Sequence, residues 1–355
     1  MGEDVEARKL GERLLLDVQV EGLNSILSSL RALDHESTTN NNTTANTSSS
    51  IPELDTLLPL LSPTILELIS PPTTHHPSGA GKTSLLYLII AHAILPSTFA
   101  SVPLNGQSSA VILLDPLQHF SARRLASVIL HLVTSKLPSP IDTTTKASLL
   151  DLTSHCLDHV HIFHPSSWSS LLATLRSLPR YLFTPTAHKS SHRRIHSLIL
   201  EDIDAFVWSL RDTTNRSSRA NNSSPLTPVS RQLTAEIKNL TDLLSCHAIL
   251  TSRSVHPTLF RPPLPTTWPA GMSVTRMGVR RVEVVKFAPG MSAEQAKAES
   301  GQRWEVVARG RFEAWRVGSA GGAGAGAGAG NGDGEGFVFR VGAKGVEIER
   351  EGGGG

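Results

Sequence analysis

Residues 53–255 alternate short apolar runs with longer segments whose apolar positions recur at helical spacing. Runs of three to six apolar residues are typical of strands buried in a sheet. Alternating strands and helices predict an α/β fold, with a mostly parallel sheet covered by helices on both faces. The expected strands are 65–69, 111–114, 159–164, 198–200 and 247–250. One expected helix directly follows a glycine-rich turn at 79–81, and the others span 121–136, 166–178 and 230–244.

The rest of the chain has different patterns. Residues 1–36 have helical spacing and predict an N-terminal helical segment, whereas 37–50 are almost entirely Ser, Thr and Asn and predict a flexible linker. We expect a nucleotide-binding core at 51–262 and a C-terminal β extension at 263–351, with a disordered Gly/Ala insertion at 318–336. Runs with partial alternation predict hairpins in the extension, at 280–287, 304–308, 312–317, 336–341 and 346–349.

Composition narrows the class of protein. The 355 residues carry a formal net charge of +2, which permits a nucleic-acid partner without arguing for one. No stretch reaches about 18 uninterrupted apolar residues, so we expect no membrane span. The N-terminus is acidic and lacks the apolar region of a secretory signal. The two cysteines, Cys156 and Cys246, are too few for a disulfide framework or a zinc site, which indicates the cytosol or nucleus.

A glycine-rich turn followed by Lys-Thr comes after the first expected strand. Backbone N–H groups of such a turn, and the start of the helix behind it, can bind a polyphosphate. Lys82 would reach the terminal phosphates of ATP, and the Thr83 hydroxyl would ligate Mg²⁺. His76 stands where the usual pattern has its first glycine, and an ordinary glycine-rich helix start is the alternative. The expected nucleotide-binding residues are Ser78, Gly79, Ala80, Gly81, Lys82, Thr83 and Ser84.

Three segments together resemble the eukaryotic RecA-like recombinase paralogues: 77–87, 111–125 and 197–208. His119-Phe120 and the Ala-Phe-x-Trp run ending at Trp208 are most similar to the X-ray repair cross-complementing protein 2 type, and the C-terminal part loosely resembles its fungal form. The resemblance implies a RecA-like P-loop core and a role in double-strand break repair by homologous recombination in the nucleus. It also implies a complex with another RecA-like paralogue that assists the recombinase on single-stranded or branched DNA, contacted directly or through the partner.

Two positions depart from the family's catalytic pattern. The Asp associated with magnesium is replaced by Glu201, with Asp202 behind it, and we expect Thr83, Glu201 and Asp202 at the metal. Active members carry a water-activating Glu two residues after the position of Asp115, where this chain has Leu117. Leucine cannot accept a proton, so no catalytic residue is assigned and efficient hydrolysis is expected to be lost. The sequence leaves open whether the protein is an enzyme.

Basic residues follow the strand at 198–200. Arg211, Arg216 and Arg219 lie in a Ser/Asn-rich stretch, which we expect to be a flexible loop that contacts DNA phosphates. A solvated loop without a ligand is the alternative. The chain's 15 histidines include clusters near 155–164 and 188–196, which we expect at the surface or at helix ends rather than around a metal.

Two other functions remain open from the sequence. The chain could be an active P-loop ATPase or a small-molecule kinase, although it has no clear arginine-rich lid segment. It could also be a scaffold whose phosphate loop is a relic. Nucleotide binding without turnover would favour the non-hydrolysing recombinase paralogue over both of these alternatives.

Overall fold

The computed structural model describes residues 49–58, 64–72, 80–138, 140, 142–217, 226–256, 259–282, 290–295, 297–298, 300, 310–318 and 336–349. The chain divides between residues 46 and 47 into two units, and all of the described residues belong to the second, Thr47–Gly355. The expected N-terminal helical segment, nearly all of the expected linker and nearly all of the Gly/Ala insertion lie outside the described residues.

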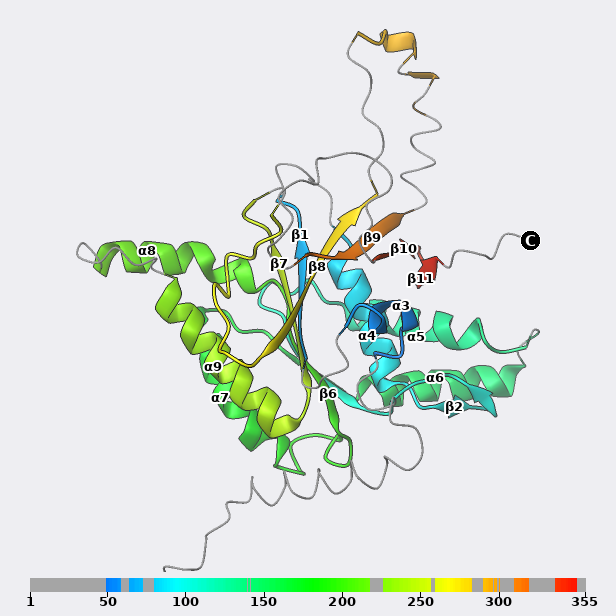
Figure 1. Ribbon diagram of the computed structural model, residues 1–355. Coiled ribbons are helices and arrows are strands. Elements are labelled where there is room, and N and C mark those ends of the chain that lie inside the picture. The colour runs from blue at the N-terminus through cyan, green and yellow to red at the C-terminus, as the bar shows by residue number, and fades with distance from the viewer. Residues whose placement is uncertain are drawn as a thin grey trace, which may run out of the picture. The chain divides into compact units, whose positions relative to one another are not determined.

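A nine-stranded sheet forms the centre of this unit (Figure 1). Its strands are β1 Thr64–Ser70, β4 Ala110–Leu114, β5 Val160–Phe163, β6 Ile195–Leu200, β7 His247–Arg253, β8 Ser273–Arg281, β9 Arg311–Arg316, β10 Gly336–Val341 and β11 Val346–Glu349. The order is β11-β10-β9-β8-β1-β7-β6-β4-β5. The neighbouring strands β8, β1, β7, β6, β4 and β5 are parallel to one another, and β9, β10 and β11 continue the sheet as antiparallel strands. The predicted α/β fold with a mostly parallel sheet is confirmed.

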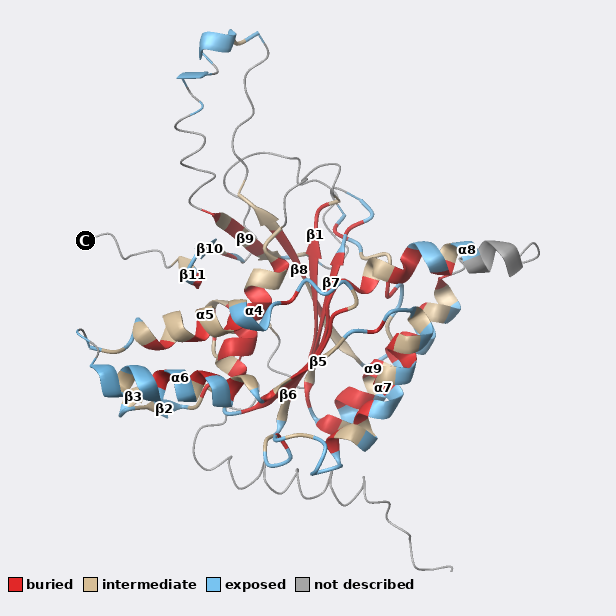
Figure 2. Cartoon of the chain, turned by 180° about the vertical axis from the view of Figure 1, so that it is seen from behind, coloured by how far each residue is buried: buried red, intermediate tan, exposed pale blue. Residues whose placement is uncertain are grey.

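Helices cover both faces of the parallel strands, and Figure 2 shows the buried strands between helices whose outer sides are exposed. They are α3 Pro52–Asp55, α4 Lys82–Ile94, α5 Ala122–Thr134, α6 Thr143–Leu157, α7 Trp168–Leu182, α8 Val207–Ser217 and α9 Thr227–Leu244, with a 3₁₀ helix at Ile203–Phe206 and a small sheet of β2 Thr98–Phe99 and β3 Val102–Pro103. Leu66 and Leu68 of β1 belong to the cluster with α4 and α5, whereas Ile65 belongs to the cluster with α7 and α9. Alternate residues of one strand therefore serve two cores. Within the described residues, no helix is long and apolar enough to span a membrane.

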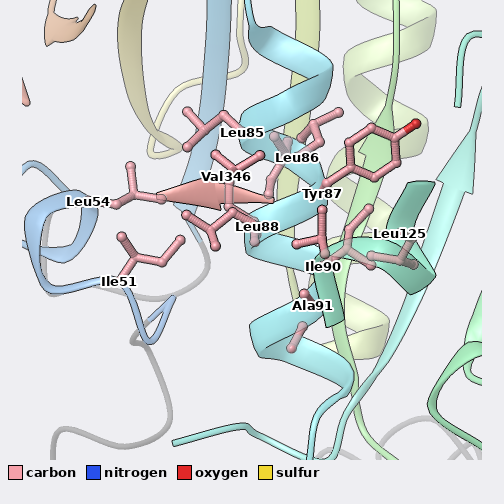
Figure 3. Close-up of a cluster of buried hydrophobic side chains, with 14 of the residues drawn as sticks. Ile51, Leu54, Leu85, Leu86, Tyr87, Leu88, Ile90, Ala91, Leu125 and Val346 are labelled. Atoms are coloured by element: carbon pink, nitrogen blue, oxygen red, sulfur yellow. The ribbon is translucent and has the colours of Figure 1, made fainter. Parts of the chain in front are cut away.

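Helix α4 is buried on nearly every side, which explains its continuously apolar sequence. Its Leu85 and Leu88 share a buried cluster with Leu54 of α3 and Val346 of β11, as Figure 3 shows. The C-terminal strands therefore cover the helix that follows the phosphate-loop sequence.

Most of the expected elements are present, with three differences. Helix α6 was not predicted, because it buries only Leu149, Thr153 and Cys156 and has little apolar periodicity. Helix α8 replaces part of the stretch interpreted as a loop. The boundary expected after residue 262 does not divide the sheet, because β8 lies parallel to β1 and in register with it. The expected hairpin strands at 312–317, 336–341 and 346–349 extend the sheet. Of the strand expected at 280–287, residues 280–281 end β8, which begins earlier at Ser273, while 283–287 and 304–308 lie outside the described residues.

Candidate nucleotide-binding site

The carboxyl ends of β1, β7, β6 and β4 lie on one edge of the sheet, because these neighbouring strands are parallel. Ligands of open α/β sheets bind outside this edge. Ser70 ends β1, Glu201 follows β6, and Asp115 follows β4. Lys82 and Thr83, at the start of α4, contact two of these three residues.

Lys82 is held at the end of β1. Gly81 precedes it with φ 86° and ψ 2°, a left-handed conformation that glycine adopts without strain. The Lys82 ammonium donates a hydrogen bond of 2.8 Å to the Ser70 hydroxyl, and the side chain is buried. Burial lowers the pKa of Lys82, and the nearby Asp202 and Asp204 oppose that shift. Ala80 and Ser84 flank this position, whereas the predicted Ser78 and Gly79 lie outside the described residues.

Thr83 and Glu201 form the second contact. The Thr83 hydroxyl donates a hydrogen bond to Oε1 of Glu201. The other oxygen, Oε2, is buried and has no hydrogen-bond partner among the described residues. Burial raises the pKa of Glu201 to about 7, and the carboxylates of Asp202 and Asp115 add to the shift.

This pair fits a magnesium ion. A cation beside Thr83 and Glu201 would satisfy the orphaned Oε2 and favour the ionised carboxylate. No group of three or more His, Cys, Asp or Glu within the described part of the chain could hold a metal alone. Mg²⁺ is commonly bound by one or two protein oxygens together with substrate phosphates, so a sparse protein site suits it.

Asp202 adopts an unusual backbone conformation at the end of β6. Its φ is 45°, in the left-handed region, which is uncommon for a residue other than glycine. Its N–H donates a hydrogen bond of 2.8 Å to the Thr251 hydroxyl of β7, which holds this turn in place. Asp204 is partly buried, its Oδ1 has no partner among the described residues, and burial raises its pKa. Two carboxylates therefore lie beside Lys82 in addition to Glu201.

The turn after β4 has no base at the expected position. Both carboxylate oxygens of Asp115 accept backbone N–H groups, from His119 at 3.1 Å and from Phe120 at 2.8 Å. Asp115 therefore shapes the turn. Leu117 is 44% exposed and has no group that could activate water. His119 Nδ1 lies 2.8 Å from Oδ2 of Asp202, a contact between two adjacent strand ends that the sequence did not suggest.

Aromatic residues from the C-terminal strands pack against the phosphate-loop glycine. A Cβ placed on Gly81 would lie 2.7 Å from Cδ1 of Phe312 and 3.1 Å from Cζ of Phe339. The two rings stack with centroids 5.5 Å apart and planes at 20°. Arg124 of α5 also binds the carbonyl oxygens of Gly342 and Ala343, which fixes the β10–β11 turn. The C-terminal strands are therefore part of the wall behind the site.

The structure describes the three predicted DNA-binding arginines only in part. Arg211 and Arg216 lie in helix α8, and Arg219 lies outside the described residues, as does the side chain of Arg216. The prediction of a flexible loop is wrong up to residue 217. Val207 and Leu210 are buried on one side of this segment, which favours a helix despite its polar composition.

The histidines of the two clusters were expected at the surface or at helix ends, and this prediction is wrong for His161 of β5 and His196 of β6, which are buried within strands. His159, directly after the end of α6, is buried as well. His159 Nδ1 and His161 Nε2 both lie within 2.9 Å of the Ser190 hydroxyl. Burial lowers the pKa of His159 and of His161 to about 4. These residues are neutral, hydrogen-bonded parts of the core at the sheet edge opposite Lys82.

The comparison with known proteins agrees with this geometry. No protein-family model matches the chain. Among curated proteins, the chain is 29% identical over 134 residues to the DNA repair protein XRCC2 of Mus musculus. The similarity supports the RecA-like paralogue family. The match covers 38% of this chain and 40% of the mouse protein, so the chain matches less than half of that protein's length. The parallel sheet with Lys82 at its carboxyl edge is consistent with a RecA-like α/β core.

Proposed function

We propose that this protein is an ATP-binding recombinase paralogue that acts in double-strand break repair by homologous recombination in the nucleus. It would work as a subunit of a complex with another RecA-like paralogue and assist the recombinase on single-stranded DNA. The observation that carries the proposal is the buried Lys82 beside Ser70, with Thr83 and Glu201 next to it. The similarity to a mouse DNA repair protein supports the cellular role, and the fungal form stays a prediction.

The site residues divide the binding of Mg²⁺–ATP between them. The backbone of 78–81 and the start of α4 would surround the phosphates, and Lys82 would neutralise the outermost ones. Thr83 and Glu201 would hold the magnesium ion, with Asp202 behind them. Magnesium, when bound, supplies charge neutralisation between the phosphates. Leu117 offers no base, so ATP would stay bound largely unhydrolysed.

Titration of a fluorescent ATP analogue in the presence of magnesium tests nucleotide binding. Lys82→Ala should weaken the affinity about 10- to 150-fold, because a charge-assisted hydrogen bond contributes about 1.5–3 kcal/mol. Lys238→Ala is the matched control, since Lys238 is an exposed lysine whose ion pair with Asp242 contributes little. Equal affinities of wild type and Lys82→Ala would remove the basis of the proposal.

The same preparations separate the alternatives. Steady ATP hydrolysis by the wild type that disappears in Lys82→Ala would indicate an active ATPase, and phosphoryl transfer to a small acceptor would indicate a kinase. A wild type that binds no ATP analogue would indicate a scaffold with a relic loop. Near-background turnover together with measurable affinity is the result expected from Leu117.

We also propose that the arginines after β6 contribute sequence-independent affinity for DNA. Each phosphate contact releases counterions, so replacing Arg211, Arg216 and Arg219 by Ala should weaken single-strand binding and flatten its salt dependence. An unchanged salt slope in the triple variant would assign DNA contact to the partner subunit. Recovery of a second RecA-like subunit by co-purification tests the proposed complex.

A further inference from the structure

Trp208 is the most exposed large hydrophobic side chain among the described residues, with 76% of its surface accessible. It lies at the start of α8, which follows the 3₁₀ helix behind Asp202 and therefore begins near the candidate nucleotide site. Val207 and Leu210 are buried, so α8 packs through that side and presents Trp208 outward. An indole left this exposed has no role in the core.

Arg211 positions the exposed indole. Its guanidinium carbon lies 5.3 Å from the centre of the Trp208 ring, a cation–π contact between residues one helical turn apart. The contact restricts the indole without covering it, since Trp208 remains largely accessible. A positioned aromatic ring next to a cation matches the two properties of nucleic acid strands, flat bases and charged phosphates.

We propose that Trp208 and Arg211 form a platform on which a base of single-stranded DNA stacks, with Arg211 held beside the strand's phosphates. The inference rests on the proposed function. It assigns the contact with DNA to an ordered aromatic side chain on α8 and no longer to a flexible basic loop. Stacking is tolerant of sequence, because every base has a π face. Asp212, next to Arg211 in the chain, offsets part of the positive charge of Arg211.

The neighbours of Trp208 favour a nucleic acid over a protein. Trp and Arg also dominate protein interfaces, but there they lie within a ring of contacts that excludes water. Among the α8 side chains that the structure describes, at 207–212, the other exposed ones are polar, namely Ser209 and Asp212. A lone aromatic residue on a polar helix face suits a ligand that stacks on one ring and remains hydrated elsewhere.

The test compares an oligothymidine of about twelve nucleotides with an abasic strand of the same length. Trp208→Ala should weaken binding to oligothymidine about 5- to 150-fold, because stacking is worth about 1–3 kcal/mol per base. It should leave binding to the abasic strand unchanged, and Trp208→Phe should retain much of the affinity. Leu150→Ala is the control, because Leu150 is an exposed hydrophobic residue on α6 and should change neither affinity.

Three results would overturn the platform. Equal losses on both strands would show that Trp208 does not contact bases, and unchanged affinity for oligothymidine would show that it does not contact DNA. Loss of partner recovery with intact DNA binding would assign Trp208 to a protein interface. Circular dichroism verifies that each variant is folded. Binding of the ATP analogue in the same variants distinguishes failure of the platform from failure of the proposed nucleotide function.

Discussion

Replacing Gly81 by alanine should destabilise the protein through two effects that can be measured separately. The first is conformational, because Gly81 has a φ of +86° that side chains with a Cβ rarely adopt. The second is steric, because the new Cβ would lie 2.7 Å from Cδ1 and 3.0 Å from Cγ of Phe312. Phe312 stacks on the fully buried Phe339, so its ring has little room to move away.

The magnitudes follow from these two effects. A left-handed conformation costs a residue with a Cβ about 1–2 kcal/mol. Forcing an extra methyl group against packed rings costs about 1–3 kcal/mol more. We therefore expect Gly81→Ala to lower the free energy of unfolding by about 2–5 kcal/mol. Gly271 is the matched control, because its φ is +84° and a Cβ there would meet nothing within 4 Å.

Urea unfolding followed by circular dichroism provides the assay. Gly271→Ala should cost only the conformational part, about 1–2 kcal/mol. In a Phe312→Ala background the nearest obstacle is gone and only Cζ of Phe339, at 3.1 Å, stays close, so adding Gly81→Ala should cost less than it does in the wild type. The difference between the two backgrounds is the coupling between Gly81 and Phe312, expected at about 1–3 kcal/mol.

Equal destabilisation by Gly81→Ala and Gly271→Ala, together with no coupling to Phe312, would refute the reasoning. It would show that the rings of Phe312 and Phe339 move aside for a methyl group without lowering the free energy of unfolding. Affinity for the ATP analogue gives an independent measurement, because a displaced Gly81 moves the backbone that precedes Lys82.

Three further predictions concern the site and the N-terminal segment. Burial raises the pKa of Glu201 to about 7, above its value in the unfolded chain, so the nucleotide-free protein should lose stability as the pH rises from about 4.5 through 7. Glu201→Gln should remove about 3 kcal/mol of this loss. Urea unfolding of wild type and variant at about pH 5 and about pH 8 measures how much stability each protein loses between the two pH values. Parallel pH profiles of the two proteins would contradict the prediction. Leu117→Glu supplies the missing base at an accessible position and should raise phosphate release about 100- to 10,000-fold, whereas unchanged turnover with intact ATP binding would show that the position cannot reach the attacking water. Deleting residues 1–36, an apolar helical segment by sequence, should reduce recovery of the partner subunit while circular dichroism shows a folded core, and undiminished recovery would exclude an assembly role.

The parallel strands could be predicted because of where they lie. Strands buried on both faces are rich in continuous apolar residues. β4 is apolar throughout, and β1, β6 and β7 each contain an apolar run of two or three residues. Because parallel strands end on the same side, the polar residues after them could be expected at one edge. Glu201 and Asp202, which the sequence assigns to a metal, follow β6 at this edge and lie near enough to Lys82 to oppose the lowering of its pKa.

Other features depend on contacts that no local pattern encodes. Helix α8 buries only Val207 and Leu210 among its first residues, so its Ser- and Asn-containing sequence is typical of a loop. The partners of the site, Ser70 and Thr251, are common residue types that gain their roles from neighbouring strand ends. The contact of Phe312 with Gly81 joins segments more than two hundred residues apart, and only the completed sheet brings them together.

The late position of β10 and β11 along the chain has a consequence for biosynthesis. A ribosome releases the chain from its N-terminus, so α4 and all the parallel strands emerge before Phe339 and Val346. Until then, Leu85 and Leu88 lack part of their apolar cover, and Gly81 lacks the Phe339 ring behind it. A nascent chain at this stage would expose apolar surface of α4 that chaperones bind. A message truncated before residue 336 would accordingly yield an aggregating product and no half-active nucleotide domain.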